Sequence, residues 1–118
     1  MRRLGDLERS VMEALWASAE PRTARSIQSS LRPGHSALTT VLTVLERLER
    51  KGFVGRDRGE RAHRYHAVRS REEYVSSLMV EALGETDDRA TALVRFVESV
   101  GDADAKTLRD ALPERRRR

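Results

Sequence analysis

The side chains best suited to recognition chemistry in this sequence are short hydroxyls and arginines, and they gather in residues 36–50 and 56–64. In the first stretch, apolar residues recur at a helical spacing, which predicts an amphipathic helix over residues 36–51. The apolar face of this helix consists of Val41, Val44, Leu45 and Leu48. The remaining face carries Ser36, Thr39, Thr40, Leu42, Thr43, Arg47 and Arg50.

Short hydroxyls in place of long charged side chains let a bulky partner approach the helix closely. Hydroxyl groups can bond to base edges, and arginines can bond to phosphates, so the face is suited to lie in a DNA major groove. Leu42 lies on the same polar face, where it can pack on a thymine methyl group or against a neighbouring element. The alternative is an ordinary solvent-exposed helix face.

The second stretch is predicted to be a β-hairpin. One strand begins at Phe53, residues 57–60 form the turn, and a second strand covers residues 61–68. Arg56, Arg58, Arg61 and Arg64 lie in or beside the turn. Basic residues at a hairpin tip beside a recognition helix would bind the phosphate backbone or enter the minor groove.

The preceding residues predict two further helices, over residues 6–17 and 23–31, and a turn over residues 32–35. Three helices with a turn before the third, followed by a hairpin, indicate a winged helix-turn-helix. After it, Ser70-Arg71-Glu72-Glu73 forms a capping box that predicts a helix to residue 83, and two more helices are expected over residues 86–100 and 102–112.

The last three helices have apolar faces too wide for their short length, which favours a second copy of the chain as the partner. The residues expected to pair the two copies are Tyr74, Val75, Leu78, Met79, Leu83, Leu93, Val94, Val97, Leu108 and Leu112. We therefore predict a mainly α fold with a small β-hairpin wing. Residues 1–69 would be the DNA-binding domain, 70–112 the helical dimerisation domain and 113–118 a basic disordered tail.

Charge is divided between the two parts of the chain. Residues 1–69 hold 14 Lys and Arg against 8 Asp and Glu, a net charge of +6, and residues 70–118 hold 9 against 11, a net charge of −2. This division suits a first part that meets a polyanion and a second part that meets protein.

Other classes of protein find little support. The chain has no cysteine, which excludes disulfides and thiolate metal sites. His63 and His66 would lie on opposite faces of a strand, so we expect no metal and no cofactor. No nucleophile, carboxylate pair or phosphate loop indicates an enzyme. The absence of a long apolar run or a signal peptide predicts a cytoplasmic protein without membrane insertion.

Five segments together resemble the BlaI/MecI penicillinase-repressor family. They are Leu4-Gly5-Asp6-Leu7-Glu8 with Val11-Met12 and Leu15-Trp16, then 39–48, Lys51-Gly52, Arg61-Ala62-His63-Arg64-Tyr65 and Ser70-Arg71-Glu72-Glu73-Tyr74. The resemblance covers about residues 4–112, and the arginine-rich composition looks actinobacterial.

This resemblance implies a homodimeric repressor of transcription that binds inverted repeats with half-sites similar to TACA, often at β-lactamase genes. Thr39, Thr40, Leu42 and Thr43 would face the groove, and Arg47 and the wing arginines, Arg61 above all, would hold the backbone. The C-terminal helices would form the dimer.

The chain departs from the family pattern in two places. Some members are inactivated by a sensor protease that cuts an Asn-Phe bond, but the matching residues here are Arg95 and Phe96, so the resemblance does not extend cleavage to this bond. The copper-responsive branch uses C-terminal cysteines, which this chain lacks. The main alternative function is a winged-helix module that binds protein without specific DNA binding.

Overall fold

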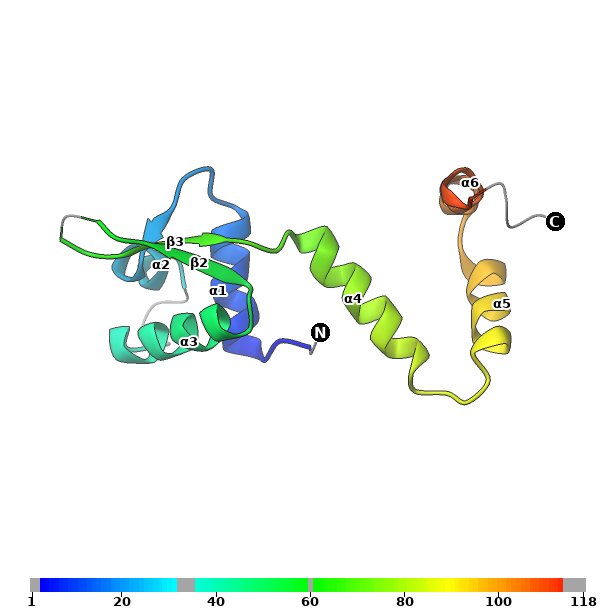
Figure 1. The fold of residues 1–118 in the computed structure, drawn as a ribbon, viewed down its shortest axis with the longest axis horizontal. Helices are drawn as coiled ribbons and strands as arrows, with labels where there is room; N and C mark the ends of the chain where they lie inside the picture. The colour runs from blue at the N-terminus through cyan, green and yellow to red at the C-terminus, as the bar shows by residue number, and fades with distance from the viewer. Residues whose placement is uncertain (1–2, 32–35, 60, 114–118) are drawn as a thin grey trace. The chain divides into compact units, whose positions relative to one another are not determined.

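The computed structural model describes residues 3–31, 36–59 and 61–113 of the 118-residue chain (Figure 1). Its elements, in order, are α1 Asp6–Trp16, β1 Arg22–Thr23, α2 Ala24–Ser30, α3 Leu38–Arg50, β2 Val54–Asp57, β3 Arg64–Ala67, α4 Arg71–Leu83, α5 Arg89–Ser99 and α6 Asp102–Ala111. Contacts divide the chain into two compact units, Met1–Met79 and Val80–Arg118. The first unit therefore extends past the boundary expected after residue 69.

The first unit is a winged helix. Strands β2 and β3 form the expected hairpin, in which Val54 lies opposite Ala67 and Asp57 lies opposite Arg64. The second strand is shorter than predicted and begins at Arg64 rather than at residue 61. Strand β1 was not predicted. It pairs with β3 on the side away from β2, so that the sheet has the antiparallel order β1-β3-β2.

One hydrophobic core holds this unit together. Helices α1, α2 and α3 turn their apolar faces toward one another and toward the hairpin, as their periodicity predicts. The buried apolar residues are Leu4, Val11, Met12, Leu15, Ala24, Ile27, Leu31, Val41, Val44, Leu45, Leu48, Phe53, Val54, Tyr65 and Tyr74. The last of these comes from α4, which explains why the unit reaches residue 79.

Most helix ends follow the local chemistry of the sequence. The Thr23 hydroxyl accepts a bond of 3.1 Å from the Ser26 amide and caps α2. The capping box at α4 is present, because the Glu73 amide donates to Ser70 Oγ at 3.0 Å and the Ser70 amide donates to Glu73 Oε1 at 2.9 Å. Helix α3 ends at Arg50, and Gly52, which follows its C-cap Lys51, has a φ of 84° that suits glycine.

Two predicted helix starts were wrong. Asp88, rather than Thr86, caps α5, because its carboxylate accepts a bond of 3.1 Å from the Thr91 amide. Helix α3 begins at Leu38, so Ser36 precedes it instead of lying in its first turn. The predicted turn at 32–35 and the arginines at 115–118 lie outside the described residues.

The second unit contains the helices α5 and α6, and neither helix buries a residue. Their most covered side chains, which include Ala92, Ala105 and Leu108, are only half-buried. Apolar side chains of α5 therefore remain in contact with solvent in the single chain. Across the described residues, no helix combines the length and the apolar character needed to cross a membrane.

Candidate nucleic-acid interface

The polar face of α3 is a continuous exposed surface. Thr39, Thr40, Thr43, Arg47 and Arg50 are all exposed, as the sequence predicts. Leu42 lies among them with 41% of its surface accessible, so it is not withdrawn into the core. Ser36, outside the helix, is half-buried, and its carbonyl accepts a bond of 3.1 Å from Gln28 Nε2. The face therefore carries hydroxyls and one leucine in the first turns of α3 and arginines in its last turns.

Local bonds orient several of these side chains. The Thr43 hydroxyl donates to the Thr39 carbonyl at 2.9 Å, which leaves its oxygen as an acceptor toward a partner. Arg50 lies 3.6 Å from Glu46, and both side chains of this pair are 69% exposed. Such a pair is weak in water and can open when a phosphate competes for the arginine.

An ion pair between a partly exposed lysine and a buried carboxylate connects the end of α3 to α1. Lys51 Nζ donates to Glu8 Oε2 at 2.8 Å, and the Gly5 amide donates to Glu8 Oε1 at 2.9 Å. Burial of the Glu8 carboxylate raises its pKa, but the bonds from Lys51 and Gly5 lower it by more, so that the pKa lies below the ordinary value. Glu8 therefore stays charged at neutral pH and keeps its bond to Lys51 at the end of α3.

The wing presents an arginine-lined recess. Arg58, Arg61 and Arg64 are exposed, as predicted, and with Thr23 they line a recess of about 510 Å³. Arg56 lies farther along β2 and pairs with Glu49 of α3 at 3.7 Å. Three guanidinium groups at one recess create a positive potential suited to phosphate oxygens.

An apolar groove of about 250 Å³ runs between α2, α3 and the wing, and sequence reasoning missed it. It is lined by Ala24, Arg25, Leu38, Leu42, Ala62, His63 and Tyr65. These residues come from α2, from α3 and from the wing, which are distant in the sequence, so no local pattern predicts the groove. The groove joins Leu42 of the helix to Ala62 of the wing.

His63 and His66 lie on the hairpin and do not converge on a common site. His63 is exposed before β3, and His66 Nδ1 lies 3.4 Å from Asp57 Oδ2 across the hairpin. A Cβ at Gly55 would lie 2.6 Å from His66 Nε2, so this glycine makes room for the imidazole. Within residues 3–31, 36–59 and 61–113, no group of three His, Asp or Glu side chains could hold a metal ion.

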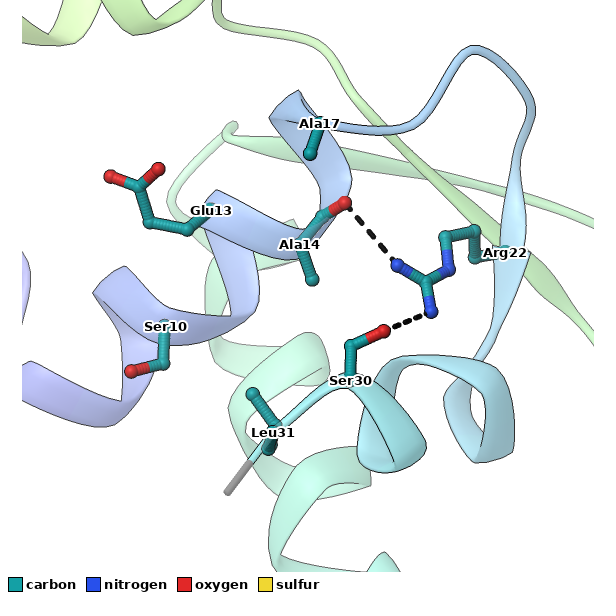
Figure 2. Close-up of a pocket in the computed structure, with 7 residues that line it drawn as sticks. All are labelled: Ser10, Glu13, Ala14, Ala17, Arg22, Ser30 and Leu31. Atoms are coloured by element: carbon teal, nitrogen blue, oxygen red, sulfur yellow. Dashed lines mark hydrogen bonds between the residues drawn. The ribbon is translucent and has the colours of Figure 1, made fainter. Parts of the chain in front are cut away.

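A cavity of about 620 Å³ lies between α1 and the end of α2 (Figure 2). Arg22, which lines it, donates to the Ala14 carbonyl and to the Ser30 hydroxyl, and also bonds to Ser26 Oγ at 2.9 Å. This guanidinium therefore cross-links α1 and α2 and is occupied by protein acceptors.

Six of the ten residues expected to pair two copies are exposed. Those with solvent-accessible side chains are Val75, Met79, Leu93, Val94, Val97 and Leu112, whereas Leu78, Leu83 and Leu108 are half-buried. Tyr74 is only 1% exposed and belongs to the core of the first unit, so its assignment to the dimer surface was wrong. Arg95 and Phe96 are exposed within the body of α5.

Comparison with known proteins identifies the family of the chain. The family model described as Penicillinase repressor matches residues 4–114. This chain belongs to the penicillinase repressor family. The transcriptional regulator BlaI of Mycobacterium tuberculosis is 50% identical over 116 residues, which cover 95% of this chain and 84% of that protein, and a second strain gives the same values.

Solved structures agree on the fold of this penicillinase repressor family member. A complex of the protein hsRosR superposes with a TM-score of 0.54 at 19% identity and covers 91% of this chain and 94% of its own. A MarR family regulator from Rhodococcus sp. RHA1 gives a TM-score of 0.50 at 19% identity, and the match covers 91% of this chain and 70% of that chain. The predicted family and the winged-helix fold are confirmed. Membership in a family of repressors also supports the prediction that the chain is not an enzyme.

Proposed function

We propose that this protein is a homodimeric, sequence-specific repressor of transcription that binds inverted-repeat operators in double-stranded DNA. The observation that carries the proposal is the continuous exposed surface of α3, from Thr39 to Arg50, beside the arginine-lined recess of the wing. In the proposed complex, α3 lies in the major groove and the wing binds the backbone.

Specificity would come from the first turns of α3. Thr39, Thr40 and Thr43 present oxygens that can bond to base edges, and short side chains allow the helix to enter the groove. Leu42, with Leu38 and Ala62 of the apolar groove, would take a thymine methyl group. A TACA-like half-site, which the family resemblance suggests, contains one thymine on one strand and two on the other for this contact.

Affinity would come mainly from charge. Arg47 and Arg50 on α3, with Arg58, Arg61 and Arg64 on the wing, would bind phosphates and release counterions. Each phosphate contact contributes a slope of about −0.9 to the dependence of log K on log salt. Five such contacts in each subunit would therefore make the binding steeply dependent on salt.

A second copy of the chain would cover the exposed apolar residues of the C-terminal helices. A two-fold dimer presents two recognition helices and therefore requires an inverted repeat. We propose that residues 70–112, without Tyr74, form the dimerisation region. The proposed targets are β-lactamase or related genes, and the proposed location of the protein is the cytoplasm. A sensor protease would be a further partner, but cleavage between Arg95 and Phe96 would first require α5 to open, because the bond lies inside the helix.

The test is fluorescence anisotropy with a labelled duplex from the promoter upstream of this protein's own gene, and with a shuffled duplex as the control. The expected result is a preference of about 10³-fold or more for the promoter, with steep salt dependence. Equal weak binding to the two duplexes would contradict specific binding of the protein to the promoter of its own gene. An absence of binding at low salt would favour the alternative, a winged-helix module that binds protein.

A further inference from the structure

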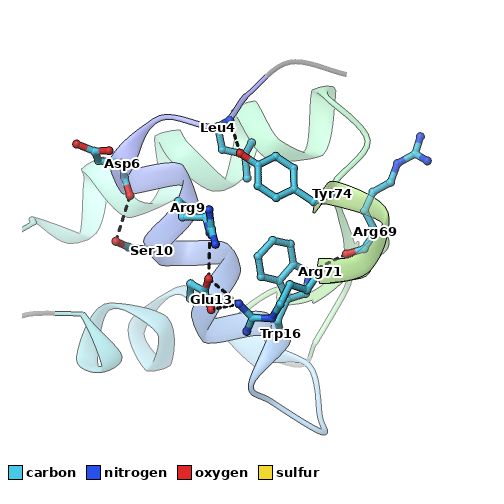
Figure 3. Close-up of polar contacts among 9 residues, drawn as sticks. All are labelled: Leu4, Asp6, Arg9, Ser10, Glu13, Trp16, Arg69, Arg71 and Tyr74. Atoms are coloured by element: carbon cyan, nitrogen blue, oxygen red, sulfur yellow. Dashed lines mark hydrogen bonds and ion pairs between the residues drawn. The ribbon is translucent and has the colours of Figure 1, made fainter. Parts of the chain in front are cut away.

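The start of α4 is bonded to α1 over the whole length of that helix (Figure 3). The Leu4 amide donates to the Tyr74 hydroxyl at 2.9 Å, Arg71 Nη1 donates to Glu13 Oε2 at 2.7 Å, and Trp16 Nε1 donates to the Arg69 carbonyl at 2.7 Å. We name these six residues the α1–α4 junction. Because they lie before, within and at the end of α1, the junction resists both tilting and rotation of α4.

Aromatic packing reinforces the junction. The Tyr74 ring lies 5.9 Å from the Trp16 ring and 5.8 Å from the Phe53 ring, the latter in an edge-on arrangement. The Arg71 guanidinium lies over the Trp16 ring at 5.0 Å, and that of Arg9 lies over the Tyr74 ring at 5.5 Å. The first turn of α4 cannot turn away without breaking part of the hydrophobic core.

The same end of α1 holds the recognition helix. The Gly5 amide bonds to Glu8, and Glu8 bonds to Lys51 directly after α3. The Leu4 amide, one residue earlier, bonds to Tyr74 of α4. Neighbouring backbone amides therefore anchor the end of α3 and the first turn of α4.

The connection into α4 adds little freedom. Only residues 68–70 separate β3 from α4, and the Val68 amide bonds to the Phe53 carbonyl at 2.8 Å. Ser70 is the cap of α4 itself. From Arg71 the helix is continuous to Leu83, so its direction is set where the junction holds it.

From these contacts we infer that Tyr74 and Arg71 are positioning residues, which fix the direction of α4 relative to α3 and thereby determine the spacing between half-sites that the dimer accepts. This inference rests on the proposed function. One inserted base pair turns a half-site by about 35° about the DNA axis. A rigid junction must distort to follow that rotation, whereas a loose connection follows it at little cost.

The test compares the wild type with Tyr74→Phe and Arg71→Gln. A random duplex library selected with the wild type supplies a full operator, and duplexes with one base pair inserted or deleted at its centre are made from it. Tyr74→Phe removes only the hydroxyl that Leu4 bonds to. Arg71→Gln breaks a pair whose side chains are about 40% exposed, so the variant should fold. Ser77→Ala is the matched control, because its hydroxyl bonds only to the Tyr74 carbonyl within α4, at 2.6 Å.

Anisotropy titrations should show the wild type and Ser77→Ala losing about tenfold or more in affinity when the spacing changes. The two junction variants should lose about threefold or less, while their affinity for a single half-site is unchanged. A purely structural role would lower all affinities together without altering the spacing ratio. An unchanged ratio in both variants overturns the inference alone, whereas a failure of the wild type to select any sequence overturns the proposed function and the inference with it.

Discussion

Replacing Lys51 by methionine tests whether its ion pair with Glu8 stabilises the attachment of α3 to α1. Lys51 Nζ lies 2.8 Å from Glu8 Oε2, and the side chains are 34% and 8% exposed. Breaking a fully buried pair leaves an uncompensated charge and costs about 3–5 kcal/mol. Because water reaches the lysine and the Gly5 amide still bonds to the carboxylate, we expect a loss of about 2 kcal/mol in the free energy of unfolding at pH 7.

The same variant should show a distinctive dependence on pH. The pKa of Glu8 in the folded state lies below 4.5, its ordinary value. A lowered folded-state pKa contributes stability that is complete above the unfolded-state pKa and is lost as the pH falls through the folded-state pKa. The penalty of Lys51→Met should therefore be full at neutral pH and should shrink below pH 4.5, as Glu8 becomes protonated.

Urea unfolding at one protein concentration, from about pH 8 to about pH 3.5, measures this penalty. Lys106→Met is the control, since Lys106 also lies 2.8 Å from its partner, Asp110, but both side chains are at least 66% exposed. Its effect should stay within about 0.5 kcal/mol at every pH. A Lys51→Met penalty that is equally large in acid, or that matches the control at pH 7, would refute the reasoning.

Three further outcomes are expected. Thr43→Ala should weaken binding to the operator more than binding to random DNA in anisotropy titrations, and equal losses would contradict its placement at base edges. Arg61→Ala should lower affinity for all sequences alike and reduce the slope of log K against log salt by about 1. A loss that depends on sequence would show that Arg61 contacts a base instead of the phosphate backbone. Met79→Asp should yield monomers by light scattering at micromolar concentration because Met79 is 51% exposed, and a dimeric mass would exclude it from the interface.

Sequence periodicity located the helices because each one turns a single apolar face to the core. Val41, Val44, Leu45 and Leu48 predict the inner face of α3, and all four are buried. The ends of helices were predictable where a side chain caps its own backbone, as Ser70 and Thr23 do. Such features are local, so nothing beyond a few neighbouring residues is needed to infer them.

Apart from the two helix starts, the errors arose where the partner of a side chain is distant in the sequence. Tyr74 has the spacing of an apolar helix face, but periodicity cannot say which core that face enters. Its hydroxyl bonds to Leu4, which lies 70 residues earlier, and only the fold brings the two together. The groove between Leu42 and Ala62 was missed for the same reason, since α2, α3 and the wing each supply part of it.

The placement of Tyr74 also changes how the two parts of the chain are understood. A boundary after residue 69 would make α4 part of a separate dimerisation domain joined by a linker. With Tyr74 in the core and Leu78 packed against it, the first two turns of α4 belong to the winged helix.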